Sequence, residues 1–229
     1  MNSPFRVAVI NDEISQDFGH ACEVASREFG MEWIELRGMW NKNLLKLDAK
    51  EVEEARRILE KNKLRVTDIA SPLFKVDWPG APKSKYSPKR DQFNADFTFE
   101  QQDEVLERSI ELAKAFHTDR VRFFDFWRLD DQARYRTAIN EKLRNAAEAA
   151  PKKDVILVLV KKPDGKTYAW AAMGQGIIDW AGQFSALKRD GYHFAVSLET
   201  HWRAAGTPEE STRQSWAGMK KELQEAGAI

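Results

Sequence analysis

The chain has 229 residues, of which 42% are hydrophobic and 31% are charged, as in ordinary soluble globular proteins. This length suits one sizeable α/β domain or two small ones. The 36 basic and 36 acidic residues leave no net charge, so no overall field gathers nucleic acid or an anionic membrane. We therefore expect a small-molecule partner, with no nucleic acid and no membrane.

The only cysteine, Cys22, excludes an intramolecular disulfide and fits a reducing compartment. The first residues, MNSPFRVAVI, lack the apolar region and the cleavage site of a secretory signal peptide. No apolar stretch approaches the roughly 20 residues that cross a membrane. A cytoplasmic location is the expectation that follows.

The first part of the chain alternates between buried strands and amphipathic helices. Apolar residues from Phe18 to Phe29 recur at helical spacing, and Gly30 predicts the end of that helix. A second helix is predicted within 49–62. The predicted strands of this part lie at 5–11, 33–37 and 64–70.

A polar connection over 71–97 precedes the next helix, for which Thr98 and Gln101 predict a capping box at its start. A strand at 119–126 and a helix at 131–149 follow. The run DVILVLV predicts a fifth strand at 154–160, and the lysines and turn signal of KKPDGK follow it where a helix is expected.

The last part of the chain contains two helices and one strand. Ile177, Trp180, Phe184 and Leu187 predict a helix, and YHFAVSLE predicts a strand at 192–199. Thr207, Pro208 and Glu210 predict the start of the final helix. Six near-continuous apolar strands that alternate with helices indicate a parallel sheet with helical cover.

In parallel α/β proteins, ligands bind at the carboxyl ends of the strands. Carboxylates, cations and tryptophans follow several predicted strands of this chain. Aromatic faces pack on sugar C–H groups, and cations hold phosphate or carboxylate, so this set predicts a site for a small polyhydroxy substrate, such as a sugar, that carries an anionic group. The predicted substrate-binding residues are Glu13, Arg37, Trp40, Lys42, Lys75, Arg122 and Trp127.

Two further segments carry candidate residues. Gly174 and Gly176 precede a predicted helix, whose free N–H groups could hold a phosphate, although a plain turn explains two glycines equally well. Glu199 and His201 follow the last strand and are the candidate catalytic pair, with Glu199 also the candidate metal ligand. The alternative for Glu199 is a structural ion pair with a nearby cation such as Arg203.

Six segments together resemble the sugar phosphate isomerase/epimerase family, whose fold is the xylose isomerase-like TIM (β/α)8 barrel. The resemblance runs from residue 7 to about 159 and resumes from about 160 to the end. Each motif is loose, but their order is fairly specific. They are DEIS at 12–15, ELR at 35–37, ASPLFK at 70–75, RFFDFWR at 122–128, GQGIIDW at 174–180 and SLETHW at 197–202.

The resemblance implies carbohydrate metabolism and a divalent metal, Mn²⁺, Mg²⁺ or Zn²⁺, held by four ligands that follow strands five to eight. The metal would bind sugar oxygens while two glutamates move a proton through an enediolate. Glu199 matches the ligand after strand eight, and the other three ligands have no counterpart in this sequence. Lysines stand where the acidic cluster after strand five is expected, which predicts weak or absent metal binding.

The simplest explanation is an internal deletion at a seam near 159–160 that removes about two βα units from a single domain over 1–229. Six of eight strands would remain, and exposed strand edges predict a homo-oligomer or a poorly stable monomer. Three functions stay open: a sugar isomerase or epimerase, a non-catalytic protein that binds an anionic sugar, and an endonuclease-type relative that acts on nucleic acid.

Overall fold

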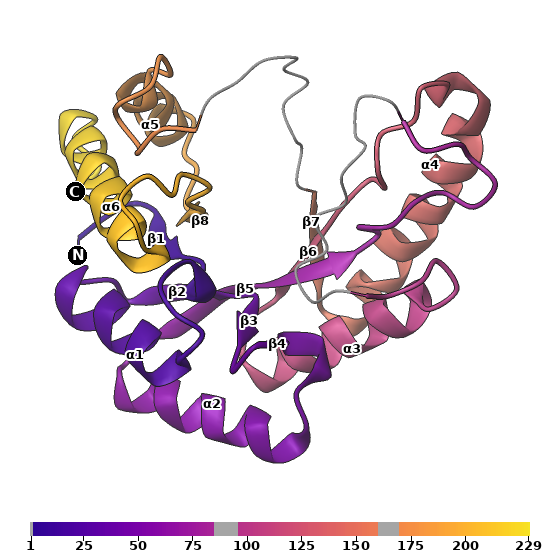
Figure 1. Ribbon diagram of the computed structural model, residues 1–229, viewed down its shortest axis with the longest axis horizontal. Coiled ribbons are helices and arrows are strands. Elements are labelled where there is room, and N and C mark those ends of the chain that lie inside the picture. Colours follow the sequence, from indigo (N-terminus) through magenta and orange to yellow (C-terminus); the bar gives the residue numbers. More distant parts are fainter. Residues whose placement is uncertain (1, 85–95, 160–169) are drawn as a thin grey trace. The chain divides into compact units, whose positions relative to one another are not determined.

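A computed structural model of the chain describes residues 2–84, 96–159 and 170–229 (Figure 1). The chain divides into two compact units. Unit 1 consists of Met1–Asn41, Asp48–Thr67 and Tyr168–Ile229, and unit 2 of Lys42–Leu47 and Asp68–Thr167. The segment KKPDGK and the carboxyl side of the predicted seam lie outside the described residues, and one domain over 1–229 stays a prediction.

The strands of unit 1 are parallel. Strand β1 (Arg6–Val9) pairs with β8 (Ala195–Leu198), with Arg6 opposite Ala195 and Val9 opposite Leu198. Strand β2 (Trp33–Leu36) lies beside the end of β1, where Ile10 and Glu35 form a parallel bridge. The carboxyl ends of these three strands therefore lie at one edge. The short strand β3 (Gly38–Met39) directly follows β2 in the chain.

Two helices of unit 1 begin at capping side chains, and that of α6 is the cap that the sequence predicts. Asp48 and Glu51 form a reciprocal capping box at the start of α2, and the hydroxyl of Thr207 accepts a hydrogen bond from Glu210 N–H at the start of α6. The first helix changes from α to π geometry half-way, which the sequence did not indicate. The bounds are α1 Phe18–Glu23, its π continuation η2 Val24–Glu28, α2 Ala49–Lys61, α5 Trp180–Arg189 and α6 Pro208–Glu225.

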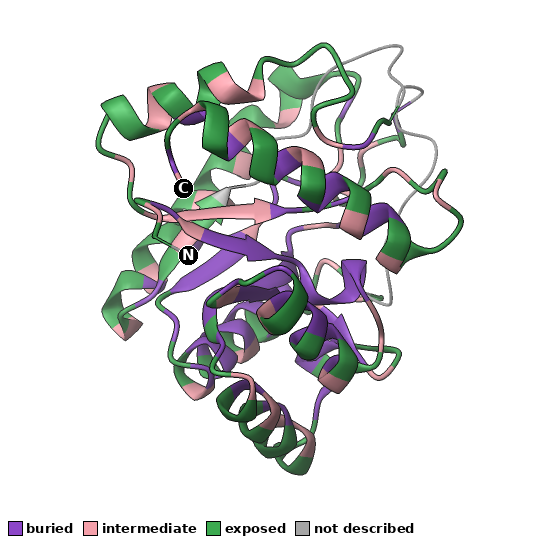
Figure 2. Ribbon diagram, turned by 90° about the vertical axis from the view of Figure 1, so that its left-hand side faces the viewer, coloured by how far each residue is buried: buried purple, intermediate pink, exposed green. Residues whose placement is uncertain are grey.

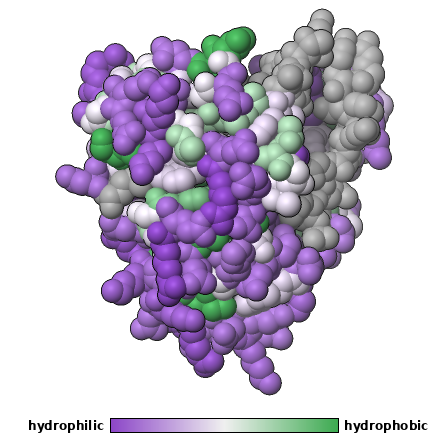
Figure 3. Space-filling model, turned by 60° about the vertical axis from the view of Figure 1, so that its left-hand side comes forward, coloured by the Kyte–Doolittle hydropathy of each residue, from purple (hydrophilic) through white to green (hydrophobic). Residues whose placement is uncertain are grey.

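Burial follows the predicted apolar faces (Figure 2). In unit 1, Phe18, Ile34, Leu36 and Leu223 are fully buried. Strand β8 is less covered than β1, because three of its four residues are only partly buried. Hydrophilic residues dominate the face in Figure 3, where hydrophobic ones form small separate areas. No described helix combines the length and the hydrophobicity that a bilayer crossing requires.

Unit 2 is also built on parallel strands. Strand β5 (Arg65–Leu73) starts in unit 1 and continues into unit 2, where Ile69 lies opposite Val121 of β6 (Arg120–Phe123). The next strand, β7 (Ile156–Leu159), pairs with β6. The remaining elements are β4 Lys42–Asn43, the 3-10 helices η3 Leu44–Lys46 and η4 Pro151–Lys153, and the helices α3 Gln102–Ala115 and α4 Gln132–Ala149.

Two predicted helix starts are wrong by a few residues. Helix α3 begins at Gln102 rather than near Thr98, because the residues between them form a turn in which Thr98 N–H donates to Gln101 Oε1 at 2.9 Å. Helix α5 begins at Trp180, because Asp179 caps it by accepting from Gly182 N–H. Ile177 therefore lies before the helix and is fully exposed.

All six predicted strands contain an observed strand, and the short strands β3 and β4 were not predicted. Strand pairing among the described residues does not close into a ring. On β7, Ile156 is 50% exposed and Val158 is 41% exposed, although the sequence predicts a fully buried strand. Such exposure fits a strand without the helical cover that an intact barrel provides. In the part of the chain that the structure describes, the fold is thus of the α/β barrel type with a sheet that is not closed.

Candidate functional site

The site in unit 1 is built where β1, β2 and β8 end. The 3-10 helix η1 (Asn11–Glu13) follows β1, Arg37 follows β2, and Glu199 follows β8. The buried side chain of Asn11 fixes the chain after β2, since its Oδ1 accepts from Arg37 N–H at 2.9 Å and its Nδ2 donates to Gly38 O at 2.5 Å. Arg37 is thereby held at the strand edge through its backbone.

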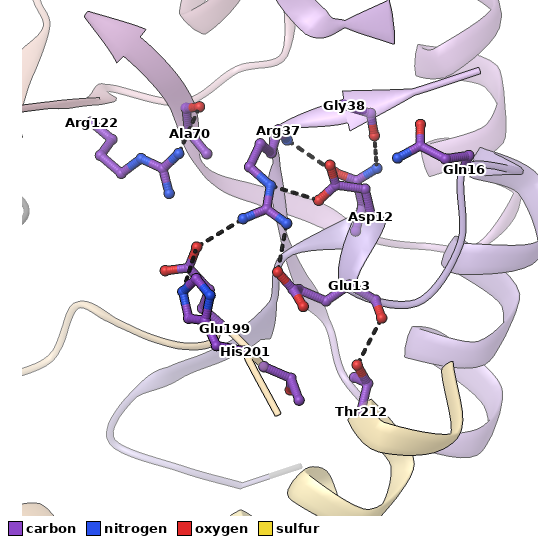
Figure 4. Close-up of polar contacts among 12 residues, drawn as sticks. Asp12, Glu13, Gln16, Arg37, Gly38, Ala70, Arg122, Glu199, His201 and Thr212 are labelled. Carbon is purple, nitrogen blue, oxygen red and sulfur yellow. Dashed lines mark hydrogen bonds and ion pairs between the residues drawn. The ribbon is translucent and has the colours of Figure 1, made fainter. Parts of the chain in front are cut away.

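The guanidinium of Arg37 contacts three carboxylates at once (Figure 4). Its Nε donates to Asp12 Oδ1 at 2.8 Å, its Nη2 to Glu13 Oε1 at 2.5 Å, and its Nη1 to Glu199 Oε1 at 2.8 Å. All three nitrogens of the planar guanidinium are thus used, which a lysine in its place could not reproduce.

The three carboxylates differ in their access to solvent. The side chains of Asp12 and Glu13 are 0% and 2% exposed, whereas that of Glu199 is 34% exposed. Burial acts to lower the pKa of Arg37, but the charges of Asp12, Glu13 and Glu199 outweigh it and raise that pKa above its ordinary value. The guanidinium is therefore a permanent positive charge, and Glu199 is the carboxylate that a ligand in solution can reach.

Glu13 has two further hydrogen-bond partners besides Arg37. Its Oε2 accepts from Arg203 Nη2 at 2.6 Å, and its backbone oxygen accepts from the hydroxyl of Thr212 on α6 at 2.7 Å. Both carboxylate oxygens of Glu13 therefore have arginine partners. Three carboxylates and two guanidiniums leave one net negative charge in this cluster, if His201 is neutral.

His201 lies beside Glu199, with 3.5 Å between its Nε2 and Glu199 Oε1. On the other side, the imidazole stacks on Trp170, with ring centroids 4.5 Å apart and 24° between the planes. Trp170 is half exposed and was not predicted as a site residue. An aromatic surface next to an accessible carboxylate is an arrangement that suits the C–H face and the hydroxyls of a sugar.

The structure thus brings together Glu13, Arg37, Glu199 and His201 of the predicted set. The predicted alternative for Glu199, an ion pair, is present, but the cation is Arg37 and not Arg203. Arg37 was predicted to hold an anionic group of the substrate, and its three nitrogens instead face carboxylates of the chain. Asp12, the first residue of the DEIS segment, had no predicted role. No sequence signal indicates Thr212.

Trp40 also belongs to unit 1, but it contacts Phe18 of α1 and Gln16, which precedes that helix. Its backbone N–H donates to Gln16 O at 2.7 Å, and its ring meets that of Phe18 edge-on, with centroids 6.1 Å apart. The residue has a positive φ of 54°, which the tight turn after β3 imposes. These contacts support a packing role and leave substrate binding by Trp40 a prediction.

The other four predicted substrate-binding residues lie in unit 2. Lys75 Nζ is 5.6 Å from the ring centroid of Phe124 and 6.0 Å from that of Trp127. Arg122 is buried and its Nη2 donates to Ala70 O at 3.1 Å on β5. Lys42 is exposed on β4. That these residues share one rim with Arg37 stays a prediction.

The glycines at 174 and 176 lie in the loop before α5, but carboxylates of the chain already use that helix start. Ala181 N–H donates to Glu222 Oε2 at 3.0 Å, and Gly182 N–H donates to Asp179 Oδ1 at 2.8 Å. A phosphate at these N–H groups would have to displace two carboxylates and would meet their negative charge. Phosphate binding there stays a prediction that this geometry does not favour.

The described residues do not fit the metal that the resemblance implies. Over 2–84, 96–159 and 170–229, no three His, Cys, Asp or Glu side chains are grouped so that they could hold a metal ion. A catalytic metal usually needs about three protein ligands and an open position. Glu199, the one matched ligand, is bonded to Arg37.

No protein-family model and no curated protein matches the chain. Similar solved structures include D-psicose 3-epimerase with D-tagatose from Clostridium cellulolyticum H10, at 11% identity and a TM-score of 0.67 over 96% of this chain and 99% of that chain. A sugar phosphate isomerase/epimerase from Parabacteroides distasonis matches at 10% identity and a TM-score of 0.62 over 99% and 94%.

A xylose isomerase-like TIM barrel protein from Mycobacterium smegmatis, solved in complex with magnesium, matches at 12% identity and a TM-score of 0.58 over 98% of each chain. At such identities the likeness is one of fold. The chain has the xylose isomerase-like TIM-barrel fold, and its structure supports the resemblance of its sequence to sugar phosphate isomerases and epimerases.

Proposed function

We propose that this chain binds a small ketose or a related polyol at the carboxyl ends of β1, β2 and β8, as a relative of the sugar isomerases and epimerases. The fold likeness supports the substrate class, since one similar structure is an epimerase solved with D-tagatose. The observation that carries the proposal is the accessible carboxylate of Glu199 beside His201 and Trp170.

In this proposal Glu199 accepts a hydrogen bond from a sugar hydroxyl, or a proton from the carbon next to the carbonyl. Arg37 fixes the carboxylate in position through its 2.8 Å hydrogen bond. Trp170 and His201 cover one face of the sugar. Carbon-acid chemistry also needs a group that stabilises the enediolate oxygen, and a cation or a hydrogen-bond donor can supply it.

A second candidate is a protein that binds the sugar without converting it. The pairing of Glu199 with Arg37 and the absence of a metal-holding group among the described residues favour this candidate. The two candidates share the binding site and differ only in proton transfer, so one experiment can separate them.

The experiment uses ¹H NMR in D₂O with free ketoses, such as D-psicose, D-tagatose and D-fructose, and with their phosphates. Saturable line broadening measures binding, and loss of the C–H signal next to the carbonyl measures proton transfer. Glu199→Gln removes the carboxylate, and Glu54→Gln on the exposed face of α2 is the matched control.

Binding with exchange that Glu199→Gln abolishes supports an isomerase or epimerase. Binding without exchange supports the non-catalytic candidate. If no sugar or sugar phosphate binds, or if Glu199→Gln binds as the wild type does, the proposed site is wrong.

A further inference from the structure

We infer that Arg37 is the resident cation of this site, and that the site takes up no divalent metal while Arg37 is in place. Arg37 would balance the carboxylates of unit 1 in this way whether or not the site binds a sugar. It gives Arg37 a role that differs from the substrate-binding role predicted from the sequence.

The first support is the convergence of three carboxylates on one guanidinium. Asp12 and Glu13 come from η1 and Glu199 from the end of β8, and each bonds a different nitrogen of Arg37 within 2.8 Å. Carboxylates at such close range repel one another and need a cation between them. In this chain the cation is a side chain.

The second support is that Arg37 is fixed. Its backbone N–H is bonded to Asn11, its side chain is only 13% exposed, and its charge is permanent. A metal ion would have to displace a tethered cation that pairs with its carboxylates within the same folded unit. Tethering gives the side chain a high effective concentration, whereas the ion competes from dilute solution.

The carboxylate oxygens that a metal would need already have partners. A divalent metal at this place would need Asp12, Glu13 and Glu199 as oxygen ligands, yet Glu13 also bonds Arg203 at 2.6 Å. As they stand around Arg37, these three carboxylates form no group that could hold an ion; they would have to close on one another after the removal of Arg37 to act as the hard oxygen donors that Mn²⁺ and Mg²⁺ prefer. Arg37 is thus the group that keeps the ion out.

A consequence for ligand choice follows from the same charges. A guanidinium offers hydrogen bonds but no coordination positions, so the site cannot chelate two sugar oxygens on a metal. The three carboxylates and two arginines keep a net negative charge. An uncharged, hydroxyl-rich part of a ligand therefore suits this site better than a phosphate does.

The test is a Mn²⁺ titration of the intact chain, followed by electron paramagnetic resonance of the free ion. The variants are Arg37→Met, Glu199→Gln, the double variant Arg37→Met with Glu199→Gln, and Arg57→Met as the control on α2. The wild type and Arg57→Met are expected to bind Mn²⁺ only at millimolar concentrations. Arg37→Met is expected to bind one ion at least about ten-fold more tightly, and the double variant to lose that gain.

Far-UV circular dichroism accompanies each titration, because Arg37→Met could unfold. In that case recovery of helical signal on addition of Mn²⁺ is the expected result. Micromolar binding of one Mn²⁺ by the wild type that Glu199→Gln abolishes overturns the inference. It is equally overturned if Arg37→Met, folded or unfolded, neither gains affinity nor recovers structure with Mn²⁺.

Discussion

Replacing Arg37 by methionine is expected to destabilise unit 1 strongly. Methionine approximates the apolar part of the arginine side chain but removes the charge and every donor. Asp12, at 0% exposure, and Glu13, at 2% exposure, would then lose the cation between them. Removing one partner of a buried ion pair costs about 3–5 kcal/mol.

The lower end of that range applies, because two features of the site reduce the cost. Glu13 keeps its 2.6 Å contact with Arg203, and Glu199 is partly exposed and can be solvated. We therefore expect a loss of about 3 kcal/mol in the free energy of unfolding, out of a typical total of about 5–15 kcal/mol.

The control is Arg57→Met on α2. Arg57 is 66% exposed and its ion pairs with Glu53 and Glu54 span 3.8 and 3.4 Å. Exposed pairs of this kind contribute about 0–1 kcal/mol. Both substitutions remove one arginine from unit 1, so their difference isolates the effect of the buried carboxylates.

The assay is urea unfolding followed by thiol labelling of Cys22, the only cysteine of the chain, which is buried in α1 of unit 1. Labelling therefore reports the unfolding of unit 1 itself. A loss below about 1 kcal/mol for Arg37→Met, or one equal to that of Arg57→Met, would refute the account of the site.

The contribution of Arg37 to the free energy of unfolding should depend on pH in one direction only. The folded-state pKa of Arg37 is raised, so its contribution is fully present below the ordinary arginine pKa and is lost only as the pH rises through the raised value. The difference in unfolding free energy between wild type and Arg37→Met should therefore stay constant from about pH 8 to pH 10. A decline across this window would mean that another group sets the charge balance.

Three further outcomes are expected. Gly218→Ala on α6 should cost about 1–3 kcal/mol, because the added methyl would overlap the backbone oxygen of Met173; an unchanged urea midpoint would contradict this packing. Thr207→Ala should cost about 1 kcal/mol by removing the cap of α6, and Thr207→Ser should restore most of it in the same assay. Native Cys22 should resist thiol reagents at pH 8, because burial, with a smaller effect of Asp17, raises its pKa; labelling as fast as that of free cysteine would be inconsistent with this.

Much of the site could be predicted because it depends on one rule of parallel sheets. Residues just after buried strands share an edge, and this rule alone is enough to group Glu13, Arg37 and Glu199 from the sequence. Which carboxylate each nitrogen of Arg37 contacts depends on side-chain conformations and on long-range contacts, for which spacing in the sequence carries no signal.

Other features of the structure were not predicted, and the reasons are local. Trp170 lies outside any strand or helix, so no periodicity marks it as a neighbour of His201. The start of α3 at Gln102 was missed because a hydrogen bond from Thr98 N–H to the side chain of Gln101 stabilises a turn as well as a helix start. The exposed face of β7 was not expected from an apolar run that is typical of a buried strand.

The most direct test of the account is the NMR resonance of Arg37 Nε–H, assigned by its absence in Arg37→Met. Its hydrogen bond to the fully buried Asp12 should protect it from exchange with solvent. We expect this resonance to stay unchanged when millimolar Mg²⁺ is added and to shift when a ketose binds at Glu199. A resonance that Mg²⁺ shifts or removes, while no ketose affects it, would contradict both the resident cation and the sugar site.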